Sequence, residues 1–200
     1  MMTARTTRKS LRPRTGGTAE RRRRSAWAWV GFAIPLVVLL LVITVSSVMG
    51  EAGSEIAAGQ APEFALPTTA GGVVSLDELL AQGDALLYFS MGVGCDGCFS
   101  QIPEAFAGLQ EQGLQLVPIM VDPADWVAQE AARIGVATPI LIDETREVSN
   151  AYGMLGVYGH SDRPSHSFAL VRADGTVAWV KHYSTMFVPL DQLLADMGGA

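Results

Sequence analysis

The segment "ALLYFSMGVGCDGCFSQIPE", residues 85–104, constrains the fold of this chain more than any other. An apolar run, Ala85–Ser90, leads through a glycine-rich turn into a stretch with the hydrophobic spacing of a helix. The run has the length of a buried strand. The chain has two cysteines, Cys95 and Cys98, and both lie where the turn ends. The segment therefore predicts a strand, a turn and a helix that starts with a Cys-x-x-Cys pair.

A cysteine pair at the start of a helix suits redox chemistry. The first turn of a helix has unpaired N–H groups and the positive end of the helix dipole, which stabilise a thiolate at Cys95. Cys98 lies about one turn further along, close enough to attack a mixed disulfide on Cys95. A disulfide that closes so short a loop constrains the unfolded chain little. We therefore predict that Cys95 is the attacking thiol and Cys98 the resolving thiol.

Strands and helices alternate through the rest of residues 61–200, which predicts an α/β fold. The alternation favours a parallel sheet in the middle, and the Asp174–Gly175 turn predicts a terminal hairpin that adds antiparallel edge strands. Before residue 85 we expect two short strands around Gly71–Gly72 and a helical turn after Ser75. The later elements are expected at 98–113, 114–122, 123–135, 138–143, 144–153, 167–183 and 189–197.

A long apolar stretch precedes this body. No charged residue lies between Ser25 and Gly50, and a helix over this stretch would span roughly 34 Å, enough for a bilayer core. Arg21–Arg24 flank it and favour a cytoplasmic N-terminus. We therefore expect a basic, disordered cytoplasmic tail at 1–24, a single-pass transmembrane anchor at 25–49, a linker at 50–60 and an extracytoplasmic domain at 61–200. A cleaved signal peptide is the alternative.

Charge is divided unevenly between the two parts of the chain. Residues 1–50 carry a net charge of +8, whereas residues 51–200 carry −14. An acidic body repels phosphate, so we expect no nucleic-acid partner. We also expect no cofactor and a monomeric protein.

These segments resemble those of a known family. "YFSMGVGCDGCFSQIPE" is similar to the strand, Cys-x-x-Cys and helix of thioredoxin-like proteins. "TPILIDETREVSNAYGMLGV" and "SFALVRADGTVAW" are similar to the redoxin branch, which includes the alkyl hydroperoxide reductase/thiol-specific antioxidant proteins. The resemblance covers residues 61–200 and implies a thioredoxin-like three-layer α/β/α sandwich with a mixed central sheet, here preceded by one transmembrane helix. It further implies a membrane-anchored thiol–disulfide oxidoreductase at the bacterial cell membrane, whose partners are protein thiols and disulfides and an unidentified redox partner.

The chain departs from the family pattern opposite the cysteines. The family has a cis-proline immediately before the strand that is "SFALV" here, whereas "DRPSHSF" has its proline one place earlier. Either this loop is one residue longer or Ser165 takes the position of the proline. We expect a substrate-binding loop at Pro164 and Ser165, with a cis bond before Pro164.

A thiol peroxidase is one alternative. Related peroxiredoxins have Thr or Ser three positions before the peroxidatic cysteine and Pro seven before, but Cys95 has Gly92 and Tyr88 there, and Cys98 fits no better. They also have an arginine three positions before the strand phenylalanine, where this chain has Ser165; Arg163 would need an altered loop. The sequence therefore favours disulfide exchange over peroxidase activity.

A copper-binding chaperone is the alternative from another class. Soft thiolates and a histidine suit Cu(I), so Cys95, Cys98 and His166 are its candidate ligands. Copper-delivering relatives have three residues between their cysteines, whereas this chain has two. We therefore favour no metal site, with His166 a polar residue of a loop or strand end.

An aspartate inside the pair bears on the direction of exchange. The negative charge of Asp96 would raise the pKa of the adjacent thiols and disfavour the thiolates. Oxidants of this type have a stabilised reduced form, so destabilised thiolates favour a reductase. Asp96 is also a candidate proton relay, and Asp84 and Glu104 compete for that role.

The stretch "HYSTMFVP" follows the expected hairpin. Its apolar members, Tyr183, Met186 and Phe187, could form a partner surface or pack in the core. We favour core packing.

Overall fold

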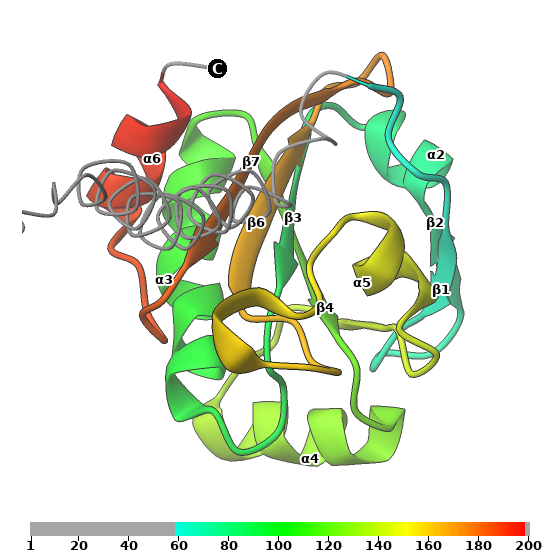
Figure 1. The fold of residues 1–200 in the computed structure, drawn as a ribbon, viewed down its shortest axis with the longest axis vertical. Helices are drawn as coiled ribbons and strands as arrows, with labels where there is room; N and C mark the ends of the chain where they lie inside the picture. The colour runs from blue at the N-terminus through cyan, green and yellow to red at the C-terminus, as the bar shows by residue number, and fades with distance from the viewer. Residues whose placement is uncertain (1–58, 199–200) are drawn as a thin grey trace, which may run out of the picture. The chain divides into compact units, whose positions relative to one another are not determined.

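A computed structural model describes residues 59–198 of the chain. The elements follow the order expected from the sequence (Figure 1). They are β1 (Ala65–Pro67), β2 (Val73–Ser75), α2 (Leu76–Leu80), β3 (Ala85–Phe89), α3 (Asp96–Glu111), β4 (Gln115–Met120), α4 (Ala124–Ile134), β5 (Leu141–Ile142), α5 (Glu147–Ala151), the 3₁₀ helix η1 (Val157–Gly159), β6 (His166–Val171), β7 (Val177–Tyr183) and α6 (Leu190–Met197).

The central sheet is mixed, as the resemblance implied. Its five strands have the order β5-β4-β3-β6-β7, with β3, β4 and β5 parallel and β6 and β7 antiparallel to their neighbours. The prediction that both hairpin strands lie at an edge was wrong for β6, which pairs with β3 inside the sheet. All residues of β6 are buried, so burial on both faces draws this strand inward.

Helices cover both faces of the sheet (Figure 1). One hydrophobic cluster joins the sheet to α3, α4 and α6 through residues such as Phe99, Val127 and Leu193. A second joins the other face to α2 and to β1, with Leu76 and Leu66 among its members. The three-layer arrangement places α3, and with it both cysteines, on the first face.

Local sequence signals account for several element boundaries. Ser75 and Glu78 form a capping box that starts α2, since each side chain accepts from the other's backbone N–H. Gly135 ends α4 in the left-handed conformation, with φ of 85°. Gly175 lies in the turn that connects β6 to β7, as the hairpin signal predicted.

The expected tail at 1–24 and anchor at 25–49 lie outside the described residues, as does nearly all of the linker. Between residues 59 and 198, no helix is both long and apolar enough to cross a membrane.

Candidate active site

The two cysteines lie where β3 passes into α3. Cys95 is the N-cap residue of α3, and Cys98 lies in its first turn. The two form a disulfide. All residues of β3, the strand that leads into the cysteine turn, are buried in the core. The strand, turn and helix therefore deliver the pair to one end of the sheet, as the sequence predicted.

The two sulfur-bearing residues differ in their surroundings. Cys98 is fully buried, whereas Cys95 retains 7% of its exposure. The backbone N–H of Cys98 donates to Sγ of Cys95 at 3.2 Å. A hydrogen bond from a helix N-terminus stabilises negative charge on sulfur. The geometry thus suits a thiolate at Cys95 once the disulfide is opened.

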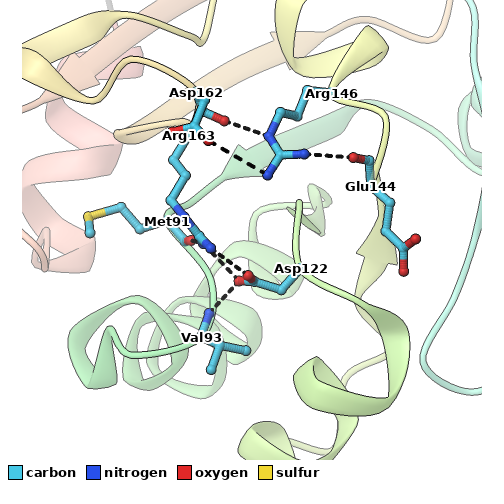
Figure 2. A network of polar contacts seen from close by, with 7 residues as sticks. All are labelled: Met91, Val93, Asp122, Glu144, Arg146, Asp162 and Arg163. Carbon is cyan, nitrogen blue, oxygen red and sulfur yellow. Dashed lines mark hydrogen bonds and ion pairs between the residues drawn. The ribbon is translucent and has the colours of Figure 1, made fainter.

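A half-buried ion pair between Asp122 and Arg163 holds the segment before Cys95 (Figure 2). The Asp122 carboxylate, only 4% exposed, follows β4 and accepts the N–H of Val93 at 2.7 Å. Arg163 donates to the two carboxylate oxygens at 2.9 and 2.7 Å and to the Met91 carbonyl at 2.6 Å. The hydrogen bonds from Arg163 to Asp122 raise the pKa of that guanidinium. We call Asp122, Arg163, Met91 and Val93 the clamp.

Arg146 supports the loop that carries Arg163 (Figure 2). Its guanidinium donates to the carbonyl oxygens of Asp162 at 2.7 Å and Glu144 at 2.8 Å. It thereby ties the loop that carries Arg163 to the segment after β5. The cysteine turn, the end of β4 and the loop before β6 consequently form one connected structure.

The clamp also explains a glycine. Gly92 has φ of 83°, and a Cβ there would collide with the Asp122 carboxylate.

Sequence reasoning did not single out Asp122, and it considered Arg163 only for a peroxidase. A signal was available, because Asp122 comes two residues after β4, which neighbours β3, and parallel strands end at the same edge of a sheet.

The loop at Pro164 and Ser165 differs from what we expected. The peptide bond before Pro164 is trans, so the expected cis bond is wrong. Trans is the intrinsically favoured isomer, and the preceding Arg163 is held in place by Asp122. Ser165 is buried, and its hydroxyl pairs with that of Ser167 at 2.9 Å. It is Arg163 from this loop that contacts the cysteine turn.

His166 is part of a buried polar chain beneath α3. Its Nδ1 lies 3.0 Å from the Tyr88 hydroxyl, which also lies 3.1 Å from the Cys98 carbonyl oxygen. Its Nε2 lies 3.2 Å from Oε1 of Gln101, which accepts the Val188 N–H at 2.7 Å. Burial lowers the pKa of His166 to about 4, so the ring is neutral at neutral pH. This histidine links β6, β3 and α3 rather than facing solvent.

The ligand set of the copper alternative is not assembled. Within residues 59–198, no three His, Cys, Asp or Glu side chains gather as candidate metal ligands. His166 has its ring nitrogens next to Tyr88 and Gln101 instead.

The carboxylates considered for pKa tuning and proton transfer occupy three different environments. Asp96 forms an exposed ion pair with Arg133 of α4, which also pairs with Glu130 at 2.7 Å. Asp84 precedes β3, at the end of the strand away from the cysteines, and pairs with Arg172 at 2.9 Å. Glu104 is an exposed residue of α3. Asp96 alone adjoins the disulfide in the chain, and Arg133 offsets its charge.

Met186 contacts the disulfide directly. Its Sδ lies 3.7 Å from Sγ of Cys95, and the residue is 40% exposed. The expected core packing is right for Tyr183, which is 7% exposed, and wrong for Met186. The loop between β7 and α6 turns the methionine toward the cysteines, and no local pattern in the sequence indicated this contact.

The model of the AhpC/TSA family matches residues 57–180. Thiol-disulfide oxidoreductase ResA of Geobacillus thermodenitrificans is 32% identical over 98 residues, which cover 47% of this chain and 55% of that protein. The match thus spans little more than half of the relative's length.

Solved structures share the fold. Peroxidoxin BcpB from Mycobacterium tuberculosis superimposes with a TM-score of 0.57 at 24% identity, covering 72% of this chain and 96% of that one. AhpC of Enterococcus faecalis superimposes with a TM-score of 0.61 at 15% identity, over 72% of this chain and 91% of that one. At these identities the likeness concerns the fold alone.

Proposed function

The chain belongs to the AhpC/TSA family, and we propose that within this family it is a thiol–disulfide oxidoreductase that exchanges disulfides through Cys95 and Cys98. The observation that carries the proposal is the Cys95–Cys98 disulfide at the start of α3, in which Cys98 is fully buried and Cys95 keeps 7% of its exposure. Cys95 is therefore the cysteine of the pair that a partner can approach, and Cys98 is left to react with Cys95.

The unequal burial assigns a role to each sulfur. In the reduced protein the Cys95 thiolate attacks a substrate disulfide, and one substrate sulfur leaves as a thiolate that takes up a proton. Cys98 then loses its proton and attacks Sγ of Cys95, which releases the second substrate sulfur and forms the Cys95–Cys98 disulfide. The substrate gains two electrons and two protons, and a reducing partner returns them to the protein. The clamp holds the turn that presents Cys95 during both steps.

The reducing direction is part of the proposal. It is supported by Asp96 beside Cys95 and by the net charge of −14 on residues 51–200, both of which disfavour thiolates. The ion pair with Arg133 works against the first of these. The reduction potential therefore depends on the balance between Asp96 and Arg133.

We also propose that the domain works outside the cytoplasm, tethered by residues 25–49. The support is the uncharged stretch from Ser25 to Gly50 behind Arg21–Arg24. Disulfides persist in extracytoplasmic compartments, where an exchange enzyme has substrates. Protease treatment of intact spheroplasts tests the location: digestion of the domain supports it, and protection contradicts it.

The exchange chemistry is tested by trapping. In the full chain, Cys98→Ser removes the resolving thiol, so mixed disulfides should accumulate at Cys95. The matched Cys95→Ser variant should accumulate none, because Cys98 is buried. Non-reducing gels and mass spectrometry read both results. Trapping by Cys95→Ser instead, or a wild-type disulfide that fails to cycle in dithiothreitol buffers, would contradict the proposal.

The direction is tested by the reduction potential. We expect a value nearer to that of thioredoxin, about −270 mV, than to that of strong periplasmic oxidants, about −120 mV. Asp96→Asn should raise the potential, because a lost negative charge stabilises the thiolate. Arg133→Ala should lower it, because the charge of Asp96 is then no longer offset. Shifts in the same direction for both variants would show that neither charge acts on the thiols in this way.

A further inference from the structure

Three sulfur atoms meet at the start of α3. Two belong to the Cys95–Cys98 disulfide, and the third is Sδ of Met186, 3.7 Å from Sγ of Cys95. The methionine lies 91 positions after Cys95, so folding alone creates the contact. The proposed exchange reaction uses the first two sulfurs and gives the third no role.

The backbone holds Met186 in place. A Cβ at Gly97 would lie 2.6 Å from the Met186 carbonyl oxygen, so the loop after β7 packs directly on the first turn of α3 at a glycine. Two residues further on, the Val188 N–H donates at 2.7 Å to the buried side chain of Gln101, also in α3. The thioether therefore lies beside Cys95 because its loop is fastened to the same helix.

The spacing of the sulfurs fits a metal ion. Bonds from a first-row metal ion to sulfur are about 2.3 Å long, so three sulfurs in a plane around one ion lie about 4 Å apart. The contact of 3.7 Å between Met186 and Cys95 is close to that value. After reduction, Cys95 and Cys98 can separate to a similar spacing, because their Cα atoms are 5.3 Å apart.

We propose that the reduced protein binds one Cu(I) ion through Cys95 Sγ, Cys98 Sγ and Met186 Sδ. Thiolate and thioether are the soft ligands that Cu(I) prefers. Both thiols release their protons as the ion binds, and neither the ion nor the protein changes oxidation state. The net charge of −14 on residues 51–200 favours the approach of a cation.

The site is linked to the redox state of the pair. The disulfide leaves no thiolate for the metal, so only the dithiol form binds copper; in this respect the inference rests on the proposed function. The exposed side of the site is Met186, since Cys98 is fully buried and Cys95 nearly so. Copper therefore enters past the methionine, and bound Cu(I) protects the dithiol from oxidation.

The test is a competition titration. The full chain is reduced, and the reductant is removed under anaerobic conditions. The protein is then titrated with Cu(I) in the presence of bicinchoninate as the competing ligand. We expect one tightly held Cu(I) per wild-type chain and affinity at least ~10-fold weaker for Met186→Leu, which keeps the bulk of the side chain and loses the sulfur. Met154→Leu is the matched control, because Met154 lies in the cluster on the opposite face of the sheet and should leave the affinity unchanged.

X-ray absorption at the copper edge gives an independent readout. Wild type should show three sulfur neighbours and Met186→Leu two. Equal Cu(I) affinity in wild type and Met186→Leu, or two sulfurs in wild type, would overturn the site. Disulfide cycling in metal-free protein is measured separately. If cycling is normal and the copper affinity of Met186→Leu is unchanged, only the copper site is contradicted. If the disulfide does not cycle, the proposed exchange function is contradicted, whether or not copper binds.

Discussion

Cys95 lies between two segments that are held in different ways. On one side, the clamp fixes Met91 and Val93 through the buried Asp122 and its double hydrogen bond with Arg163. On the other side, the loop after β7 is fastened by a neutral hydrogen bond from Val188 to Gln101 and leaves Met186 exposed. The clamp keeps the reacting sulfur in place, whereas the loop presents an adjustable side chain beside it.

The largest expected effect comes from breaking the clamp. Asp122→Ala leaves the guanidinium of Arg163 without its carboxylate and the Val93 N–H without its acceptor, so we expect a loss of about 3–4 kcal/mol of unfolding free energy. Urea unfolding measures it. Asp125→Ala removes an exposed aspartate from the first turn of α4 and should cost less than about 1 kcal/mol, the size of its interaction with the helix dipole. Equal effects of the two substitutions would show that the clamp is not structural.

On the side of the loop after β7, the unfolding free energy should depend on pH through His166, because this ring and the Val188 N–H share Oε1 of Gln101. The pKa of His166 is about 4 in the folded protein, below its ordinary value of 6.5. As the pH falls, His166 therefore takes up its proton in the unfolded chain before it does so in the folded protein. The contribution of His166 to the unfolding free energy is complete above pH 6.5 and is lost as the pH falls toward 4. A shift of this size corresponds to about 3 kcal/mol.

His166→Gln isolates that contribution from the other titrating groups. Unfolding free energies of wild type and variant are measured from pH 7 to pH 4. The advantage of wild type should shrink as the pH falls through this window. A constant difference would show that His166 takes up its proton equally in both states.

Substitutions at two glycines near the clamp distinguish the cost of a steric collision with Asp122 from the cost of backbone strain. Gly92 and Gly94 both have positive φ, of 83° and 92°, but only a Cβ at Gly92 meets Asp122. Gly94→Ala should cost about 1 kcal/mol for the strained backbone, and Gly92→Ala clearly more, about 2–3 kcal/mol. Thermal unfolding compares them, and equal costs would mean that Asp122 moves aside freely.

The smallest effect on stability is expected at the exposed side chain. Met186→Ala should change the unfolding free energy by less than about 0.5 kcal/mol, because the residue is 40% exposed. It should nevertheless speed the reduction of the disulfide by dithiothreitol severalfold, since it uncovers Sγ of Cys95. Met186→Leu, which keeps the cover, should react like wild type. An unchanged rate in Met186→Ala would show that the methionine does not restrict access.

Much of the fold could be predicted from local patterns. The order of strands and helices, the helix start at the cysteines, the cap at Ser75 and the turn at Gly175 each depend on residues close together in the chain. The place of β6 inside the sheet could not be predicted in this way, because pairing with β3 depends on packing between distant segments. The trans bond before Pro164 likewise differs from an expectation based on family spacing.

The sequence by itself determined that a strand, a turn and a helix present Cys95 and Cys98 as a pair, because hydrophobic period and helix-start chemistry are local properties. Only the tertiary structure decided what surrounds the pair. Asp122 and Arg163 are 41 positions apart, and Met186 is 91 positions from Cys95. Their contacts depend on how the layers pack, and no period or motif along the chain records that packing.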